Sequence, residues 1–358
     1  DAHANVSPAR KNGKSAEDSD GDGMWDDWEL CFELNPLEDD REDDPDLDGL
    51  TNIDEYMYSL TTYGGAVLLR TFSSTGTVSG AFSPDGSRIV SGHWFEEFNI
   101  CAYAKLWDVS TGERLQTFCD HTWTVTALAF SPDGATVLTG SGDSTAKLWD
   151  AETGTLLHTL SGHTFNVSSV DFAPDGTQVL TGSLDDTAKL WDVTSGAEVR
   201  TFSGHSADVH SACFSPDGTQ VLTASNDKTA KLWDATTGAE LRTFSGYDAC
   251  VMSACFSPDG TAVLIGACDG VARLWDVATG EEIRAFAGHS AELSSVDYSP
   301  DGHQILTGSM DGTARLWDAA TGGEITFFPV ANSVPPEVCF SPVGRHVLPA
   351  AFDPQLWT

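Results

Sequence analysis

The feature that most constrains this chain is a sequence pattern that returns every 42 residues. The clearest copy runs from Gly162 to Phe202 and reads GHTFNVSSVDFAPDGTQVLTGSLDDTAKLWDVTSGAEVRTF. A tryptophan marks each copy, at Trp107, Trp149, Trp191, Trp233, Trp275 and Trp317, and Trp357 follows after 40 residues. A fixed period of this length is typical of repeat architectures, in which each repeat is one supersecondary unit.

Each copy predicts four short strands. In the copy just quoted they are Val167 to Phe172, Gln178 to Gly182, Thr187 to Trp191 and Glu198 to Phe202, all rich in Val, Leu, Thr and aromatic residues. The turn at residues 174–176, Pro-Asp-Gly, supplies a fixed φ, a side-chain acceptor and a position for φ > 0. One such sheet cannot bury both of its apolar faces, so we expect an all-β chain of sheets stacked around an axis.

The recurring motifs G-H, S-P-D-G, S-x-D and L-W-D, between Ala66 and Thr358, resemble those of the WD-repeat β-propellers. The resemblance implies a seven-bladed propeller in which a His, a Thr or Ser, an Asp and the Trp form a network inside each blade. The matching sets are His121, Thr139, Asp143 and Trp149; His163, Thr181, Asp185 and Trp191; His205, Thr223, Asp227 and Trp233; and His289, Thr307, Asp311 and Trp317. A His–Asp–Thr set can indicate catalysis, but its recurrence favours a structural role.

The two ends of the repeat region are complementary. Residues Ala66 to Phe72 match only a fourth strand, whereas Val334 to Thr358 match the first three. We expect these ends to pair and close the ring, because closure removes sheet edges that are open to aggregation. The predicted propeller therefore spans residues 63–358.

Two acidic segments before the propeller fit the twelve-residue template of a calcium loop. A hard cation takes six to eight oxygens, which alternate side chains of a tight loop can bring to one point around a glycine. Gly23 and Gly49 make the turns, and Met24 and Leu50 would contribute backbone carbonyls. The side-chain ligands predicted for two calcium ions are Asp18, Asp20, Asp22, Asp26 and Glu29 in the first loop, and Asp44, Asp46, Asp48, Asn52 and Glu55 in the second.

Residues 15–62 are thus predicted to form a small calcium-binding module of loops and short helical turns. It resembles the EF-hand-like and thrombospondin type 3-like modules of secreted bacterial proteins, although no convincing helix enters its first loop. Dockerins share such paired loops, so docking onto a partner is a further possibility; the alternative is a solvated acidic run. Residues 1–14 are interpreted as a tail or linker.

The charge of the chain restricts its partners. The sequence has 54 acidic against 18 basic residues, a net charge of −36. Nucleic acids and anionic membrane surfaces require a basic face, so both are excluded as expected partners. No apolar run approaches the roughly 20 residues of a membrane span. Protein partners, including further copies of this chain, remain.

The eight cysteines form no C-x-x-C pattern. Cys213, Cys255 and Cys339 share one repeat position and are interpreted as small core residues. Cys250 and Cys268 fall on the same rim of the fifth repeat, which has Tyr247 and Ile265 in place of its His and Thr. We predict a disulfide between Cys250 and Cys268 that replaces the missing network. A second one, between Cys101 and Cys119, is predicted from their place on the same rim; such bonds indicate an oxidising compartment.

That rim also collects the candidate partner-binding residues, because Trp and other large apolar side chains on a surface are typical binding hot spots. An insertion of six residues in the first repeat carries three aromatic residues; the alternative is that it folds over and buries them. The candidates are Trp94, Phe95, Phe98, Trp123, Phe165 and Leu184.

The sequence favours a non-enzymatic, extracytoplasmic protein-interaction scaffold of bacterial origin, secreted or on the cell surface, with structural calcium sites. The alternative is a subunit that assembles itself into a surface layer or an extracellular fibre. A propeller enzyme is a minor alternative. It would rest on Asp171, Asp297 and His210, which lie on first strands and do not form a constellation.

Overall fold

The computed structural model describes residues 68–71, 77–93, 102–329, 337–342, 344, 347–350 and 355–357. The chain divides into two compact units, Asp1–Val67 and Leu68–Thr358, and all described residues belong to the second. The tail, the two predicted calcium loops and the aromatic residues Trp94, Phe95 and Phe98 lie outside the described residues.

The described residues form strands and no helix, as the repeat pattern predicts. In chain order the strands are β1 (Leu68–Thr71), β2 (Thr77–Phe82), β3 (Arg88–His93), β4 (Ala102–Asp108), β5 (Arg114–His121), β6 (Val125–Phe130), β7 (Thr136–Ser141), β8 (Thr145–Asp150), β9 (Leu156–Ser161), β10 (Val167–Phe172), β11 (Gln178–Ser183), β12 (Thr187–Asp192), β13 (Glu198–Ser203), β14 (Val209–Phe214), β15 (Gln220–Ser225), β16 (Ala230–Asp234), β17 (Glu240–Phe244), β18 (Val251–Phe256), β19 (Ala262–Ala267), β20 (Val271–Asp276), β21 (Glu282–Ala287), β22 (Leu293–Tyr298), β23 (Gln304–Ser309), β24 (Thr313–Asp318), β25 (Glu324–Pro329), β26 (Glu337–Phe340), β27 (Val347–Ala350) and β28 (Gln355–Trp357).

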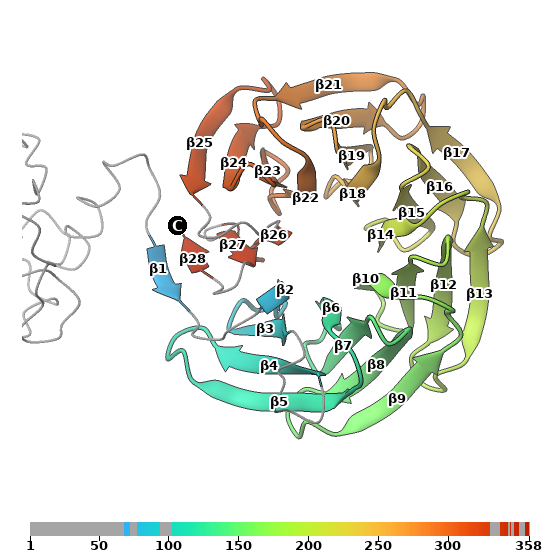
Figure 1. The fold of residues 1–358 in the computed structure, drawn as a ribbon, viewed down its shortest axis with the longest axis vertical. Helices are drawn as coiled ribbons and strands as arrows, with labels where there is room; N and C mark the ends of the chain where they lie inside the picture. Colours follow the sequence, from blue (N-terminus) through green and yellow to red (C-terminus); the bar gives the residue numbers. More distant parts are fainter. Residues whose placement is uncertain are drawn as a thin grey trace, which may run out of the picture. The chain divides into compact units, whose positions relative to one another are not determined.

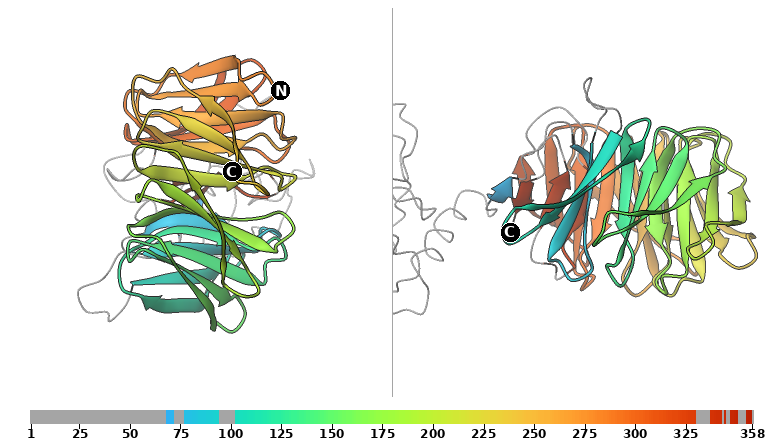
Figure 2. Two further views of the ribbon diagram at one scale, coloured as in Figure 1. Left: turned by 90° about the vertical axis from the view of Figure 1, so that its right-hand side faces the viewer. Right: turned by 90° about the horizontal axis from the view of Figure 1, so that it is seen from below.

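These strands make four-stranded antiparallel sheets that follow one another around a central axis (Figure 1). We call the sheets blades one to six in chain order, from β2–β5 to β22–β25. The remaining sheet, here the joint sheet, has the order β1-β28-β27-β26 and so contains strands from both ends of the unit. In it, β1 pairs antiparallel with β28, with Leu68 opposite Trp357. The strands run between the two faces of the ring (Figure 2).

The hydrophobic core lies between neighbouring blades. One cluster joins Leu138 and Leu148 of blade two to Val170, Phe172 and Trp191 of blade three, all 9 % exposed or less. Close approach here requires glycine. A Cβ on Gly140 in β7 would lie 2.8 Å from Val167 Cγ1 of the next blade. Each blade therefore buries its apolar faces against its neighbours, as the repeat architecture requires.

The outermost strand of each blade behaves differently. Its side chains are mostly exposed, with one buried phenylalanine or leucine near the end of the strand, such as Phe202 in β13. The second strand is almost entirely buried, as in β11. Polar residues on second strands consequently need hydrogen-bond partners inside the protein, and this requirement determines the site described next.

Candidate functional site: a polar network that carries an aromatic rim

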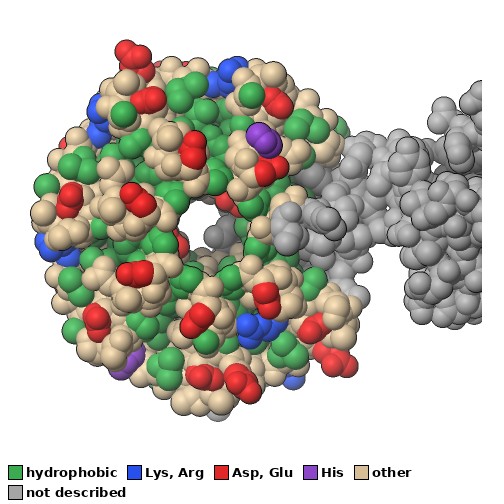
Figure 3. All heavy atoms as spheres, turned by 180° about the vertical axis from the view of Figure 1, so that it is seen from behind, with side chains coloured by type: hydrophobic (Ala, Val, Ile, Leu, Met, Phe, Trp, Pro, Cys, Tyr) green, Lys and Arg blue, Asp and Glu red, His purple; other side chains and the backbone are tan. Residues whose placement is uncertain are grey.

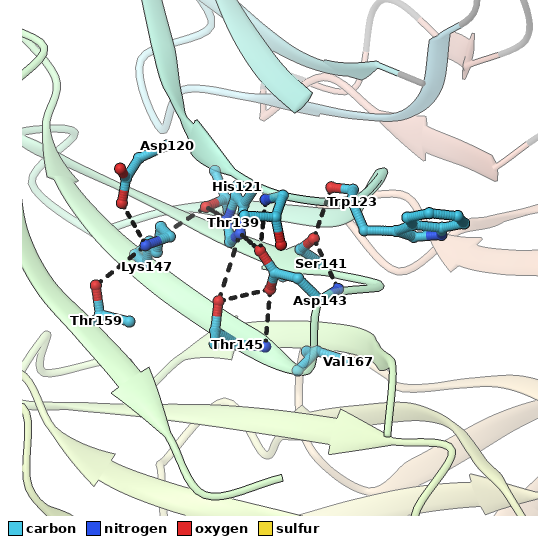
Figure 4. Close-up of polar contacts among 12 residues, drawn as sticks. Asp120, His121, Trp123, Thr139, Ser141, Asp143, Thr145, Lys147, Thr159 and Val167 are labelled. Carbon is cyan, nitrogen blue, oxygen red and sulfur yellow. Dashed lines mark hydrogen bonds and ion pairs between the residues drawn. The ribbon is translucent and has the colours of Figure 1, made fainter. Parts of the chain in front are cut away.

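Four blades contain the same chain of buried hydrogen bonds. In blade two, His121 Nδ1 lies 2.9 Å from Asp143 Oδ2, and His121 Nε2 lies 2.7 Å from Thr139 Oγ1 (Figure 4). The Trp149 indole N–H donates to the same threonine oxygen at 3.0 Å. Blades three, four and six repeat this geometry with the sets predicted from the sequence: His163, Thr181, Asp185 and Trp191; His205, Thr223, Asp227 and Trp233; and His289, Thr307, Asp311 and Trp317.

The direction of each hydrogen bond follows from the chemistry of the groups. An ionised carboxylate only accepts, so the histidine Nδ1 carries the proton and donates it. Burial lowers the pKa of His163, His205 and His289, which favours the neutral ring. Burial alone would raise the pKa of Asp185, but hydrogen bonds, first among them the one from Thr187, outweigh this effect and lower it. In the neutral ring Nε2 accepts the threonine hydroxyl proton.

These sets have the residue types of a catalytic triad, but a substrate could not reach them. The hydroxyl oxygen would have to reach a substrate, and the side chains of Thr139 and Thr181 are 0 % exposed. Both nitrogens of each histidine are already engaged within the blade. The network therefore stabilises the blade, which is the structural role that recurrence in the sequence favours.

The network also fixes the loop that precedes the first strand of each blade. In blade two, the Thr122 N–H donates to Asp143 Oδ2 at 2.9 Å, and Ser141 Oγ donates to the Trp123 carbonyl at 2.8 Å. In Figure 4 the Trp123 indole points away from the network. In blade three, Ser183 Oγ donates in the same way to the Phe165 carbonyl at 3.1 Å. The network thus presents one variable side chain per blade at the same position.

We call these loops, together with the turns between second and third strands, the rim loops. Trp123 and Phe165 are 60 % and 55 % exposed, as expected for partner-binding residues. Gly142 supports Trp123, because a Cβ there would lie 2.3 Å from Trp123 Cδ1. Leu184, at the repeat position of Gly142, is half-buried, and its N–H donates to the carbonyl of residue 166 at 2.9 Å.

One rim residue was missed by the sequence reasoning. Met310 is 49 % exposed and occupies the repeat position of Leu184 in blade six, three periods later. That spacing is the signal that could have identified it. Glu292 is exposed in the neighbouring loop, and the Met310 N–H donates to its carbonyl at 2.9 Å. Both residues line one end of the central channel.

A cavity of about 270 Å³ in the central channel is lined mainly by the first strands of blades two to six. Hydroxyls on its wall bond to the next blade, as Ser168 Oγ does to the Val209 carbonyl at 2.6 Å. Among the described residues, His210 Nε2 is buried without a hydrogen-bond partner. Ser79 Oγ, on the first strand of blade one, is also buried without such a partner, but two atoms on separate blades do not form a catalytic constellation.

The two first-strand aspartates form hydrogen bonds that connect neighbouring sheets. Asp171 accepts the Phe172 N–H with one oxygen and the Phe214 N–H of the next blade with the other, at 2.9 and 2.8 Å. Asp297 does the same with Tyr298 and Phe340. Burial raises the pKa of Asp171 and Asp297 to about 6 despite these bonds. Both oxygens of each carboxyl are thus committed to the backbone.

Blade five replaces the network, as predicted, but in two ways rather than one. A disulfide joins Cys250 and Cys268, which confirms this pairing. In addition, the Trp275 indole N–H donates to the Tyr247 hydroxyl at 2.6 Å, so the tryptophan keeps a partner. The His–Thr–Asp–Trp network is absent from this blade, as expected, since Asp269 pairs with Arg273, but the sequence did not predict the new partner of the tryptophan. Ile265, at the threonine position, is 0 % exposed.

The remaining cysteines divide into two kinds. Cys119 is disulfide-bonded, and Cys101 lies outside the described residues. Cys213, Cys255 and Cys339 pack against the apolar clusters between blades, as expected for core residues. Burial raises the pKa of the Cys213 and Cys255 thiols, which makes them poor nucleophiles.

Blade one builds its network from a different element. Trp107 donates to Ser91 Oγ at 2.8 Å, and Ser91 Oγ lies 2.9 Å from His93 Nε2. The imidazole comes from the second strand of the same blade, and not from the rim loop. The sequence motif lacks its G-H in this repeat, so motif matching alone could not identify His93.

The predicted metal ligands cannot be compared with the structure, because they all lie outside the described residues. Within the described part of the chain, no group of three or more His, Cys, Asp or Glu side chains could hold a metal ion. That part also contains no helix long and apolar enough to cross a membrane.

Comparison with known proteins agrees with this geometry. The WD domain, G-beta repeat family matches five stretches that together cover more than half of the chain: residues 112–150, 154–192, 196–234, 238–276 and 280–318. Protein FIZZY-RELATED 2 of Arabidopsis thaliana is 37 % identical over 65 residues, which are 18 % of this chain and 13 % of that protein. The B-type cell cycle switch protein ccs52A of Medicago truncatula is 38 % identical over 64 residues, again 18 % of this chain and 13 % of that protein. The chain thus spans about an eighth of these relatives, whereas the family match extends through five of its repeats. This chain belongs to the WD-repeat family.

Proposed function

We propose that this protein is a non-enzymatic scaffold that binds polypeptide partners on its rim loops. The observation that carries the proposal is that blades two and three have buried polar residues and exposed aromatic ones. There the polar residues form hydrogen bonds within the blade. The same network bonds to the backbone of the loops that carry Trp123 and Phe165, whose side chains are exposed to solvent. Large aromatic side chains held in fixed positions bind well, because little side-chain entropy is lost on association.

The polar residues argue against the enzymatic alternative. The threonines of the four networks are buried, and each carboxyl of Asp171 and Asp297 accepts two backbone N–H groups. Neither group is positioned to take a proton from a substrate. His210 then remains alone among the candidates in the channel, which supports a binding role over chemistry.

We extend the proposal to the first unit and to the location of the protein. The two twelve-residue loops are proposed to bind structural calcium, and the protein to act outside the cytoplasm of a bacterium. Extracellular calcium is about 1 mM, which suits modules that bind in the range of about 0.1–1 mM or tighter. The disulfide between Cys250 and Cys268 supports this location, because such bonds persist mainly in oxidising compartments.

The joint sheet is proposed to close the ring as its seventh blade. The pairing of β1 with β28 supports this role, since it brings a strand from the start of the unit into the sheet made by its end. Without β1, the last sheet would expose an edge. Deleting residues 63–72 should therefore abolish soluble folding, and a deletion variant that folds well would contradict the role.

One observation favours the alternative of a self-assembling subunit. The outermost strands of six consecutive blades expose an aliphatic residue at the same repeat position, between 44 % and 50 % exposed: Leu115, Leu157, Val199, Leu241, Ile283 and Ile325. A belt of apolar side chains around a ring can pack against the belt of a second copy. Sedimentation with calcium and with chelator distinguishes the two proposals, because only the assembly should change size with calcium.

The test of the scaffold proposal uses the full chain and two variants. The purified full chain is used to recover its partner from native cell extract and culture supernatant, and co-purifying chains are identified by mass spectrometry. Trp123→Ala with Phe165→Ala should abolish recovery of the partner without changing the melting temperature. Phe327→Ala is the matched control, because Phe327 is 53 % exposed but lies on an outermost strand. Equal recovery with the rim variant would refute the rim as the binding surface.

A further inference from the structure

The rim loops carry mainly negative charge. We consider residues 122–124, 164–166, 206–208, 248–250 and 290–292 and the turns 142–144, 184–186, 226–228, 268–270 and 310–312. These described loops contain one cation, Lys228. Its Nζ donates to the Asp248 carbonyl at 2.8 Å. Besides the four aspartates that pair with histidines, these loops carry five carboxylates, Asp186, Asp208, Asp248, Asp269 and Glu292; of these, Asp269 is paired with Arg273 at 2.7 Å.

The rest of the repeat region is also negatively charged. The repeat region has 35 acidic and 14 basic residues, and acidic side chains are also scattered over the face of the ring seen in Figure 3, the reverse of the one in Figure 1. Several of the bases are engaged inside blades, as Lys189 is by Glu198 at 2.9 Å. An acidic partner would be repelled over its whole approach, whereas a basic one would be attracted.

Blade three places a carboxylate beside the apolar rim residues. Phe165 and Leu184 lie on rim loops that a backbone hydrogen bond ties together, and Asp186 follows Leu184 by two residues. Unlike its neighbour Asp185, which is engaged by His163, Asp186 forms no ion pair with another described residue. An apolar contact and an unpaired negative charge therefore lie within one short stretch.

The backbone at this turn supports a binding role. Ser144, Asp186 and Lys228 adopt φ of +68°, +68° and +69°, whereas blades five and six have Gly270 and Gly312 at the same repeat position. Glycine takes this conformation without strain, and L-residues do so only at a cost. Blades two to four thus retain side chains where the turn favours glycine, in the same part of the ring as Trp123 and Phe165. Retention of strained residues is typical of functional sites.

We infer that the partner of the rim is a basic polypeptide segment in which Lys or Arg residues flank an aromatic or large aliphatic side chain. This inference rests on the proposed scaffold function and specifies its partner. The apolar side chain contacts Trp123 or Phe165, and the flanking cations face Asp186 and Glu292. A cation over the Trp123 indole adds attraction through the negative face of the ring.

The test is a selection from a displayed library of random dodecapeptides, with the full chain as bait. Enriched peptides should contain at least two Lys or Arg residues around a large apolar one, and few acidic residues. The best peptide is synthesised with a fluorophore, and its dissociation constant is measured by anisotropy. Trp123→Ala with Phe165→Ala should weaken binding at least about tenfold. Raising the salt concentration from 50 to 300 mM should also weaken it, since exposed charges are screened.

A charge-reversal pair tests the electrostatic part. Asp186→Lys should weaken binding of the peptide about three- to tenfold, mainly through slower association. Glu281→Lys is the matched control, because Glu281 is exposed in the loop between the third and fourth strands of blade five, outside the rim loops. Melting temperatures of all variants establish that they are folded. An equal loss in both variants would mean a diffuse charge effect and would overturn the inference.

Two further outcomes separate this inference from the function on which it rests. Peptides that need Trp123 and Phe165 but carry no excess of basic residues would overturn the inference and leave the scaffold proposal standing. Enrichment that survives the Trp123→Ala/Phe165→Ala variant would overturn both. Self-association that disappears in this variant would identify a second copy as the occupant, and would also overturn the inference.

Discussion

The hydroxyl group of Thr181 is the centre of the blade three network, since it donates to His163 and accepts from Trp191. The hydroxyl oxygen lies 2.7 Å from His163 Nε2 and 2.9 Å from Trp191 Nε1, and the threonine is 0 % exposed. Blade five has no hydroxyl group at this position. It has Ile265 at the same position, and the Tyr247 hydroxyl accepts from its tryptophan at 2.6 Å. The chain therefore provides a partner for the buried tryptophan in two ways, and the arrangement of blade five can be introduced into blade three by substitution.

The single substitution Thr181→Ile should be strongly destabilising. It leaves the Trp191 N–H and His163 Nε2 buried without their partner, and each unsatisfied group costs about 1–3 kcal/mol. The free energy of unfolding should fall by roughly 2–6 kcal/mol, before any strain from the extra methyl group. Adding His163→Tyr supplies a hydroxyl for the indole, so the double variant should be more stable than Thr181→Ile alone.

The assay is a double-mutant cycle in guanidinium chloride, followed by tryptophan fluorescence. The two substitutions should couple favourably by about 2 kcal/mol or more, because they share one hydrogen-bond network. Thr201→Val is a control for threonine loss, because it removes a half-buried hydroxyl of the same blade that bonds to Lys189 and Glu198 and not to His163; it should not couple to His163→Tyr in this way. A double variant that costs the sum of the two single ones would refute the reasoning, as would a cost below 1 kcal/mol for Thr181→Ile.

Three other predictions follow from the structure. Replacing Cys250 and Cys268 by serine removes a bond that spans 18 residues, so unfolding should become easier by about 3 kcal/mol, seen as a lower melting temperature in oxidising buffer. The carboxyls of Asp171 and Asp297 have pKa values raised to about 6, so the folded state holds their protons more tightly than the unfolded state does. The stability that this gives is complete below pH of about 4 and is lost as pH rises to about 6, by about 3 kcal/mol per carboxyl; replacing both by cysteine, as in sister blades, should remove that slope from the pH dependence of unfolding. Chelator should lower the melting temperature, because calcium present at a hundred times its dissociation constant stabilises by about 2.7 kcal/mol, and an unchanged value would argue against occupied loops.

The parts of the fold that could be predicted are those encoded by local chemistry. The Pro-Asp-Gly turns, the alternating strands and the regular spacing predict four-stranded sheets, and Gly176 has the expected positive φ of 71°. The networks could be predicted because their members recur at fixed separations, and the Cys250–Cys268 disulfide because both residues fall on one rim.

The parts that were missed depend on how far a side chain reaches in three dimensions. His93 supplies its imidazole from a second strand, and Tyr247 reaches Trp275 with a hydroxyl that histidine does not have. Neither residue preserves the motif. His93 keeps the hydrogen bond to the hydroxyl that accepts from Trp107, whereas Tyr247 accepts from Trp275 itself. The exposure of Met310 likewise depends on the packing of its turn, which the sequence pattern does not contain.

Variation at a repeat position is informative only once the contacts of that position are known. Asp171 and Cys213 occupy the same first-strand position, and each faces the backbone N–H of the next blade, Phe214 for the carboxyl and Phe256 for the thiol. Here different side chains perform one structural task, so the presence of an aspartate does not indicate chemistry. The position of Trp123 is the opposite case. The network bonds to its backbone carbonyl and not to the indole, so the hydrogen bonds of the blade do not require a tryptophan here. This difference between a side chain that is bonded inside the blade and one that is not is the reason why we propose the rim as the binding surface.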